Sequence, residues 1–166
     1  MTNKEFAQWV YDAAKSLDID PIFVTAQAAL ETGWGKSRIG KYNLFGITKG
    51  TWTGRTQLVK TREVHSTANY AYFAPEKVIS VEALPSGRYR YIVMRLFRDY
   101  DTLEQCLEDY IAIFKKPHFA HAWGFRHDGA KFADAIQSGR MKYATDPKYN
   151  SILKSVMNTI KGYVNE

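Results

Sequence analysis

The sequence predicts an α+β protein built from two unequal lobes, with helices at both ends of the chain and a small β-lobe between them. Apolar residues recur at helical spacing before residue 55 and again after residue 101, but this period disappears between about residues 55 and 98. β-Branched and aromatic residues dominate that middle stretch, which is typical of strands. This order predicts a mainly helical lobe and a small β-hairpin lobe that flank a cleft suited to an extended polymer.

The chain has 166 residues, of which 45% are hydrophobic. Because this length allows one substantial core, we expect 1–166 to form a single domain with the β-insert at about 55–98. The 23 Lys and Arg residues exceed the 17 Asp and Glu residues, giving a net charge of +6 that favours polyanionic partners. The basic residues are interleaved with acids and form no stripe with aromatics, so we expect no nucleic-acid binding.

The first helix is predicted from a cap and a periodic face. Thr2 followed by Glu5 is a capping-box pattern. The apolar face that follows holds Phe6, Val10, Ala13, Ala14 and Leu17.

The second helix is predicted over residues 21–32. Asp20 and Pro21 provide an N-cap and a proline at the first helical position, and Gly33 and Gly35 end the helix. One face holds Val24, Ala28 and Glu31. Glu31 is therefore expected at a helix C-terminus.

The β-lobe is predicted from two strand-like runs, at 57–61 and 89–93, and from a turn at 85–87. The stretch 75–85 between them is expected to be a mobile loop.

A long helix is predicted after the β-lobe, capped by Asp101 or Thr102. Its apolar stripe is Leu103, Cys106, Leu107, Tyr110, Ile111 and Phe114. The single cysteine, Cys106, can form no intrachain disulfide and is expected to pack as a small hydrophobe. A shorter helix is predicted over 130–138 and ends at Gly139.

Asp146 and Pro147 are expected to open the last helix. Its buried side is predicted to hold Tyr149, Ile152, Leu153, Val156, Met157 and Ile160.

Glu31 stands out chemically because residues 21–30 carry no charge and Trp34 follows closely. A carboxyl in such surroundings is partly desolvated, which raises its pKa, and the negative end of the helix dipole acts in the same direction. An acid that stays protonated near neutral pH can donate its proton to a glycosidic oxygen.

The segment 27–37, Gln-Ala-Ala-Leu-Glu-Thr-Gly-Trp-Gly-Lys-Ser, together with Asn-Leu-Phe-Gly-Ile at 43–47, resembles the signature of glycoside hydrolase family 73. Phe-Arg-Asp-Tyr at 97–100 and Tyr-Ala-Thr-Asp-Pro-Lys-Tyr at 143–149 are similar to two further motifs of the family, so the resemblance covers most of the chain. It implies a lysozyme-like fold that hydrolyses the β-1,4 bond between N-acetylglucosamine and N-acetylmuramic acid, with Glu31 as general acid.

The resemblance implies a second carboxylate in the β-lobe, and Thr-Arg-Glu at 61–63 matches the run that carries it. Glu63 is therefore our choice for the group that activates water or stabilises the oxocarbenium charge. The stretch between Glu63 and Phe97 is longer than is usual in the family, and Glu76 and Glu82 within it remain alternatives.

Tyr143 matches a family tyrosine near the acid, whose hydroxyl could hold the acetamido group of the substrate or the reacting water. The predicted substrate-binding residues are Trp34, Asn43, Phe45, Gly46, Tyr70 and Tyr149. His118, His121 and His127 could suggest a metal, but their segment resembles a family loop, so we expect no metal and no cofactor.

The expected partner is the glycan strand of peptidoglycan, with the chain acting as a monomer in the periplasm or cell wall. The N-terminus lacks the apolar core of a signal peptide and no stretch is long enough to span a membrane, so delivery would use a leaderless route or a leader that has been removed. Possible settings are a phage endolysin, an autolysin and an injected toxin with an immunity or inhibitor protein in its cleft. Two alternatives remain open: a muramidase of the same fold and a catalytically silent wall-binding module.

Overall fold

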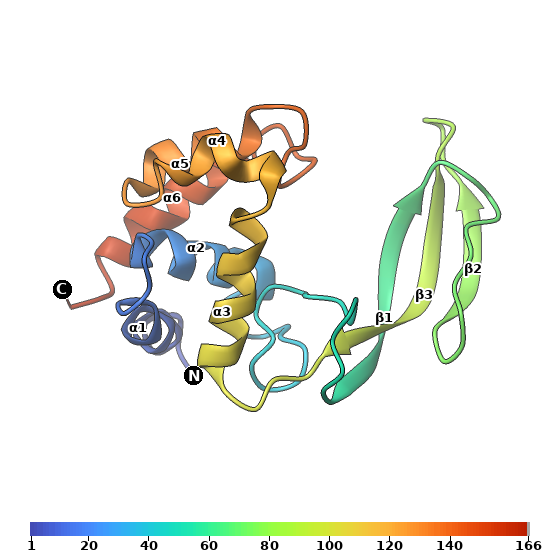
Figure 1. The fold of residues 1–166 in the computed structure, drawn as a ribbon, viewed down its shortest axis with the longest axis horizontal. Coiled ribbons are helices and arrows are strands. Elements are labelled where there is room, and N and C mark those ends of the chain that lie inside the picture. Colours follow the sequence, from blue (N-terminus) through green and yellow to red (C-terminus); the bar gives the residue numbers. More distant parts are fainter. Residues whose placement is uncertain (166) are drawn as a thin grey trace.

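The structure is a computed structural model, and it describes residues 1–165. A helical lobe contains most of the chain, and a three-stranded antiparallel sheet projects from one side of it (Figure 1). The helical lobe holds α1 (Asn3–Ala14), α2 (Pro21–Thr32), α3 (Leu103–Phe114), the 3-10 helix η1 (Pro117–Phe119), α4 (Ala120–Trp123), α5 (Gly129–Gln137) and α6 (Tyr149–Lys161). The sheet lobe holds β1 (Thr56–His65), β2 (Lys77–Ala83) and β3 (Tyr89–Arg98). The predicted α+β class and its order of elements are confirmed.

Both N-terminal helices begin at the predicted caps. The Oγ1 of Thr2 accepts the backbone N–H of Glu5 at 3.1 Å, and the backbone N–H of Thr2 donates to the Glu5 carboxylate at 2.7 Å. The Asp20 carboxylate accepts the N–H of Ile22 at 2.9 Å, with Pro21 as the first residue of α2. These bonds satisfy N–H groups that a helix start otherwise leaves unpaired.

α2 is the buried centre of the helical lobe, because its first ten residues carry no charge. It packs against α1, α5 and α6. Phe23 contacts the rings of Phe114 and Phe132 edge-on, with centroids 6.2 and 4.8 Å apart. Cys106 is fully buried in the same core, and burial raises the pKa of its thiol to about 12. It packs as the small hydrophobe that the sequence predicted.

The start of α6 and its buried face differ from the prediction. α6 begins at Tyr149, and Asp146 instead forms a turn in which its carboxylate accepts the N–H of Lys148 at 2.8 Å. Ile152 was expected to be buried but is 39% exposed. The side of α6 that contacts the core is a narrow stripe of Tyr149, Leu153, Met157 and Ile160, and Ile152 lies beside it.

The sheet has the strand order β1-β3-β2, with both neighbouring pairs antiparallel. The predicted turn at 85–87 joins β2 to β3, and the N–H of Leu84 donates to the Arg88 carbonyl across it at 2.8 Å. The prediction of a mobile loop over 75–85 is wrong, because most of it forms β2. All seven residues of β2 are exposed and an irregularity in pairing falls between Val78 and Ser80, so no apolar alternation marks this strand in the sequence.

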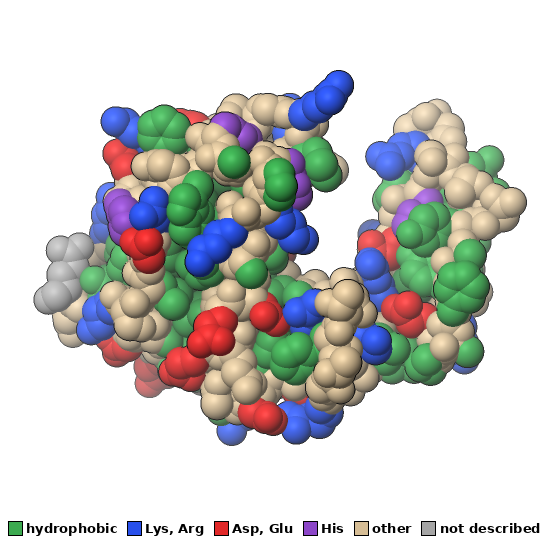
Figure 2. All heavy atoms as spheres, in the orientation of Figure 1, with side chains coloured by type: hydrophobic (Ala, Val, Ile, Leu, Met, Phe, Trp, Pro, Cys, Tyr) green, Lys and Arg blue, Asp and Glu red, His purple; other side chains and the backbone are tan. Residues whose placement is uncertain are grey.

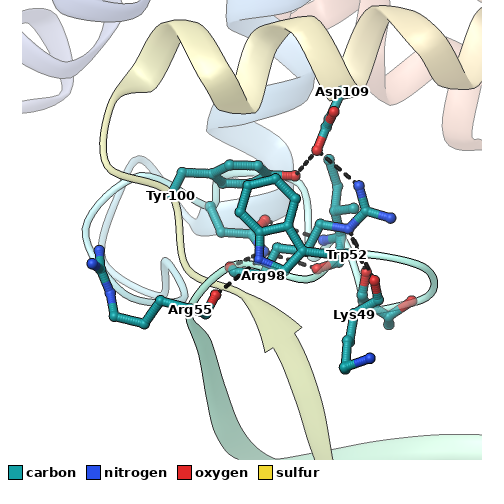
Figure 3. A network of polar contacts seen from close by, with 9 residues as sticks. Lys49, Trp52, Arg55, Arg98, Tyr100 and Asp109 are labelled. Carbon is teal, nitrogen blue, oxygen red and sulfur yellow. Dashed lines mark hydrogen bonds and ion pairs between the residues drawn. The ribbon is translucent and has the colours of Figure 1, made fainter.

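A polar network joins the sheet lobe to the helical lobe (Figure 3). Arg98, at the end of β3, donates to the Asp109 carboxylate of α3 at 2.8 Å and to the Thr48 carbonyl at 2.9 Å. The Tyr100 hydroxyl donates to the same Asp109 oxygen at 2.8 Å. The Asn43 amide donates to the Arg98 carbonyl at 2.9 Å. The sheet is therefore anchored to the middle of α3 through one strand end.

Candidate active site

Glu31 lies in the last turn of α2, and the Thr-Gly-Trp-Gly run at 32–35 fixes where this helix ends. Gly33, Trp34 and Gly35 are all left-handed, with φ of 55°, 61° and 85°. The Thr32 hydroxyl accepts the N–H of Gly35 at 2.8 Å and closes this turn. A Cβ at position 35 would lie 2.6 Å from the Phe6 ring, so α1 leaves room there for glycine alone. The carboxyl thus projects from a helix end that is tightly held.

Burial raises the pKa of the Glu31 carboxyl, and a hydrogen bond with Tyr149 acts in the opposite direction but more weakly. Glu31 as a residue is nevertheless exposed at the surface. Within residues 1–165, no lysine, arginine or histidine forms an ion pair with it. A partly desolvated carboxyl that has no cationic partner keeps its proton to higher pH than an ordinary glutamate, and the protonated form is the one a general acid needs.

A chain of buried polar groups lies behind Glu31. Gln27, fully buried one turn earlier on α2, donates from Nε2 to the Tyr149 hydroxyl at 3.0 Å, and its Oε1 accepts a hydrogen bond from the Tyr110 hydroxyl. Tyr143 lies next to Tyr149, with ring centroids 5.7 Å apart. Burial is the main cause of the raised pKa of each of these three tyrosines, so all remain protonated donors.

The structure brings together Glu31, Tyr143 and Tyr149 from the predicted residues and adds Gln27 and Tyr110, which the sequence analysis missed. Gln27 had one signal, since it and Thr25 are the two polar side chains in the otherwise apolar run at 21–30. Tyr110 had none, because it follows the apolar stripe of α3 like any core aromatic.

Glu63 lies on β1 of the sheet lobe, opposite Tyr91 of β3. Arg95 of β3 donates to its carboxylate at 2.7 Å, and both side chains are partly exposed. Glu63 and Glu31 therefore belong to different lobes. Figure 2 shows a broad hollow between these lobes, wide enough to be seen as open space in the space-filling view.

The two rival carboxylates have other contacts. The Glu76 carboxylate accepts the backbone N–H of Leu96 at 2.9 Å and so extends the hydrogen bonding of β3 beyond the start of β2. Glu82 is exposed on the outer strand β2 and pairs with Arg90 at 3.3 Å. Glu63 stays our prediction for the second carboxylate.

The predicted substrate-binding residues are distributed over both lobes. Asn43 is 1% exposed, and its amide is bonded to backbone groups of Ile47 and Arg98, so in this structure it braces the lobe junction. Phe45 stacks on Tyr110, with centroids 4.0 Å apart. Phe45 and Gly46 line a pocket of ≈ 440 Å³ against α3. Gly46 has a φ of 61° and faces open space.

The other two aromatic residues of this set, Trp34 and Tyr70, lie in different lobes. Trp34 packs edge-on against Tyr163, with centroids 5.8 Å apart, in the helical lobe. Tyr70 is 47% exposed on the sheet lobe and lies flat against His65, with centroids 3.7 Å apart and an interplanar angle of 3°. Tyr70 therefore offers an aromatic surface that is held in place from behind. Contact of these residues with a glycan stays a prediction.

Two of the three histidines considered for a metal have polar protein partners. His121 bonds to the Ala135 carbonyl at 2.9 Å, and His127 pairs with Asp18 at 2.9 Å. Over residues 1–165, no group of three or more His, Cys, Asp or Glu side chains is arranged to hold a metal ion. Among the same residues, no helix has the length and apolarity required to cross a membrane.

A carboxyl whose pKa is raised by its surroundings and that lies next to buried tyrosines, in a helical lobe joined to a sheet lobe, is the kind of acid that glycoside hydrolases use. Residues 7–162 match the glucosaminidase family, described as mannosyl-glycoprotein endo-beta-N-acetylglucosaminidase. The chain belongs to this family of glycoside hydrolases.

Similar proteins agree with the fold and the family. A crystal structure of a peptidoglycan hydrolase mutant from Sphingomonas sp. A1 is 36% identical, with a TM-score of 0.64 over 96% of this chain and 97% of that one. The peptidoglycan hydrolase FlgJ of Pseudomonas aeruginosa is 30% identical over 91% of this chain, and a probable N-acetylmuramidase of Lactococcus lactis subsp. cremoris is 31% identical over 83%. The chain spans 34% and 28% of the lengths of these last two relatives. The lysozyme-like fold expected from the resemblance is confirmed.

Proposed function

We propose that this chain hydrolyses the β-1,4 bond between N-acetylglucosamine and N-acetylmuramic acid in peptidoglycan. Glu31 protonates the glycosidic oxygen as the bond breaks. Glu63 activates the attacking water or stabilises the oxocarbenium charge from the sheet lobe. The glycan lies in the hollow between the lobes, where Tyr143 holds the acetamido group or the water.

The observation that carries the proposal is the state of Glu31, whose pKa is raised by burial and which has no cationic partner among the described residues. A module that only bound the wall would gain nothing from a desolvated carboxyl, because burying an ionisable group costs free energy without improving a surface contact. The printed names of the Sphingomonas and Pseudomonas relatives, both peptidoglycan hydrolases, support the choice of substrate.

The ion pair between Glu63 and Arg95 supports the role of Glu63. An arginine that donates at 2.7 Å fixes the position of the carboxylate on the sheet, and a base or an electrostatic stabiliser needs such a fixed position. Inverting hydrolysis and assistance by the acetamido group differ in the anomer that forms first, so proton NMR of the fresh product distinguishes them.

The test uses purified sacculi and measures new reducing ends after digestion. Wild-type protein is expected to release fragments whose reduction with borohydride yields the alditol of N-acetylglucosamine. Glu31→Gln should lower the rate by at least about 100-fold, as expected for loss of a general acid. Glu108→Gln, which changes an exposed glutamate of α3, is the matched control and should keep full activity. Full activity of Glu31→Gln would show that the acid is wrongly assigned.

A muramidase of the same fold is the second candidate, and the Lactococcus relative named as a probable N-acetylmuramidase favours it. The same digest separates the two, since a muramidase yields the alditol of N-acetylmuramic acid. Binding to sacculi with no new reducing ends would instead support a silent wall-binding module.

The substrate places the site of action in the periplasm or cell wall, and we expect the chain to act as a monomer. Lysis of the wall suits an endolysin, an autolysin or an antibacterial toxin. If it is a toxin, an immunity protein that fills the hollow is expected, and a cognate inhibitor should then protect sacculi from digestion.

A further inference from the structure

The hydrogen bonds in the buried polar chain behind Glu31 have a fixed order of donors and acceptors. Gln27 contacts Tyr149 through its amide nitrogen and Tyr110 through its amide oxygen. An amide side chain can be turned either way round, because its nitrogen and oxygen ends are nearly equal in size. The direction therefore depends on the partners at each end.

The burial of Tyr110 determines this direction. Its side chain is 0% exposed, and within residues 1–165 Gln27 is the only hydrogen-bond partner of its hydroxyl. If the amide nitrogen faced Tyr110, the phenolic proton would be buried with no acceptor, which is unfavourable. The amide oxygen therefore accepts the Tyr110 proton, and the amide nitrogen is left facing Tyr149.

The direction extends to Glu31. The Tyr149 oxygen accepts the proton of the Gln27 amide, so the hydroxyl keeps its own proton for another acceptor. The Tyr149 hydroxyl lies near enough to Glu31 to lower the pKa of its carboxyl, which makes the Glu31 carboxylate the acceptor for that proton. Hydrogen bonds in a chain strengthen one another, since a hydroxyl that accepts is a better donor.

We propose that Tyr110 and Gln27 are positioning residues of the reaction: together they hold the Tyr149 hydroxyl as a donor to the carboxylate that Glu31 becomes once it has given up its proton. Neither residue touches the reacting atoms. The inference rests on the proposed function, because it assigns a task to groups that serve Glu31 as the acid.

The titratable groups that face Glu31 come from three parts of the helical lobe. They are Tyr110 of α3, Tyr143 in the loop before α6, and Tyr149 of α6. All three have a pKa raised above the ordinary tyrosine value, so none titrates in the range where Glu31 does. A pH titration over that range therefore reports Glu31.

The direction of the amide can be tested on the unmodified protein by NMR. We expect nuclear Overhauser contacts from the Gln27 amide protons to the Tyr149 ring edge that are stronger than those to the Tyr110 ring edge. The opposite pattern would overturn the proposal, and this measurement does not depend on activity or on a variant that must fold.

The effect on Glu31 is tested with Tyr110→Phe. Phenylalanine keeps the stacking on Phe45 but removes the hydroxyl that donates to the Gln27 oxygen. The Gln27 amide can then rotate, so that its oxygen accepts the proton of the Tyr149 hydroxyl. The Glu31 pKa, followed by carbon-13 NMR and assigned by its loss in Glu31→Gln, should rise above the wild-type value. On sacculi, kcat should fall about tenfold with KM within about twofold, and the alkaline limb of the pH profile should move to higher pH.

Two comparisons separate positioning from a merely structural effect. Tyr11→Phe, which alters a buried tyrosine of α1, should leave the Glu31 pKa and the pH profile unchanged. In a protein that already carries Tyr149→Phe, adding Tyr110→Phe should not shift the Glu31 pKa further, because the Tyr149 hydroxyl through which Tyr110 acts is absent. An unchanged Glu31 pKa in Tyr110→Phe, or an equal shift in both backgrounds, would refute the positioning role. If the Glu31 pKa shifts as expected but the wild-type protein releases no reducing ends from sacculi, the proposed function is refuted while the positioning of Tyr149 by Gln27 and Tyr110 stands.

Discussion

The protonation state of Glu31 depends on two opposing contacts of a single side chain. The protein packed around the carboxyl removes water and raises its pKa, while the Tyr149 hydroxyl favours the carboxylate. Burial is the larger cause, so the neutral acid persists to higher pH than for an ordinary glutamate. Once the proton has been transferred, the hydroxyl becomes the group that stabilises the product carboxylate. The same pair of contacts therefore serves the acid before and after the reaction.

This balance predicts how Glu31→Gln changes stability with pH. The folded-state pKa of Glu31 lies above its unfolded value, so the native state binds the proton more tightly and wild-type stability falls as pH rises from the unfolded pKa through the folded one. Glutamine is neutral at every pH and avoids that loss. Glu31→Gln should therefore have a higher Tm than wild type at pH 8, and the difference should shrink toward zero at pH 3.5. A difference that stays constant between these pH values would contradict the raised pKa.

At the scale of single residues, the sequence allowed the acid of the site to be predicted but not its partners. The raised pKa of Glu31 followed from an uncharged run and a helix end, both local features, and its direction is confirmed. The partners of Gln27 lie 83 and 122 residues away in sequence, so no local pattern could show them. The pairing of Glu63 with Arg95 joins two strands whose register the sequence did not determine.

At the scale of elements, the helices were predictable where their ends are set by local bonds. The caps at Thr2 and Asp20 and the glycine that ends α2 all act within a few residues. β2 was not predictable, because a strand with every residue exposed has no buried face to impose alternation. The exposure of Ile152 was missed for a related reason, since the width of a buried helix face depends on what packs against it.

The turn that ends α2 yields a prediction with an internal control. Gly33 and Gly35 both have positive φ, but a Cβ would meet open space at Gly33 and the Phe6 ring at Gly35. Gly33→Ala should lower the free energy of unfolding by about 1 kcal/mol, the cost of a left-handed alanine. Gly35→Ala should lower it by roughly 3 kcal/mol, because overpacking adds to that cost. Urea denaturation measures both, and equal losses would show that the Phe6 contact is unimportant.

At the scale of the whole molecule, the two lobes form separate structures joined at a narrow junction. The sheet lobe has its own aromatic cluster around His65, and it connects to the helical lobe through the end of β3 and the loop around Thr48 (Figures 1 and 3). A junction of this kind can set the width of the hollow, and with it the distance between Glu31 and the sheet lobe. The two lobes could be predicted from composition, but their relative placement could not, because it depends on contacts of single side chains such as Arg98 and Asn43.

Arg98 is the residue through which this placement can be tested. Arg98→Met removes the bond to Asp109 and both carbonyl contacts, at Thr48 and Lys49, while keeping an unbranched apolar chain next to Trp52. We expect a stability loss of about 1–3 kcal/mol and a wider range of distances between the lobes, since these bonds hold β3 to α3. Spin labels on cysteines replacing Lys60 and Lys131, both exposed and one in each lobe, would report this range by pulsed electron resonance.

The buried Cys106 should not react with the label, so no further substitution is needed. Arg90→Met breaks the exposed Arg90–Glu82 pair within the sheet and is the matched control, expected to leave the distance distribution unchanged. If Arg98→Met also leaves it unchanged, the polar network does not hold the lobes in place. If the distribution widens and KM on sacculi rises while the Glu31 pKa stays constant, the junction sets the shape of the hollow without altering the acid.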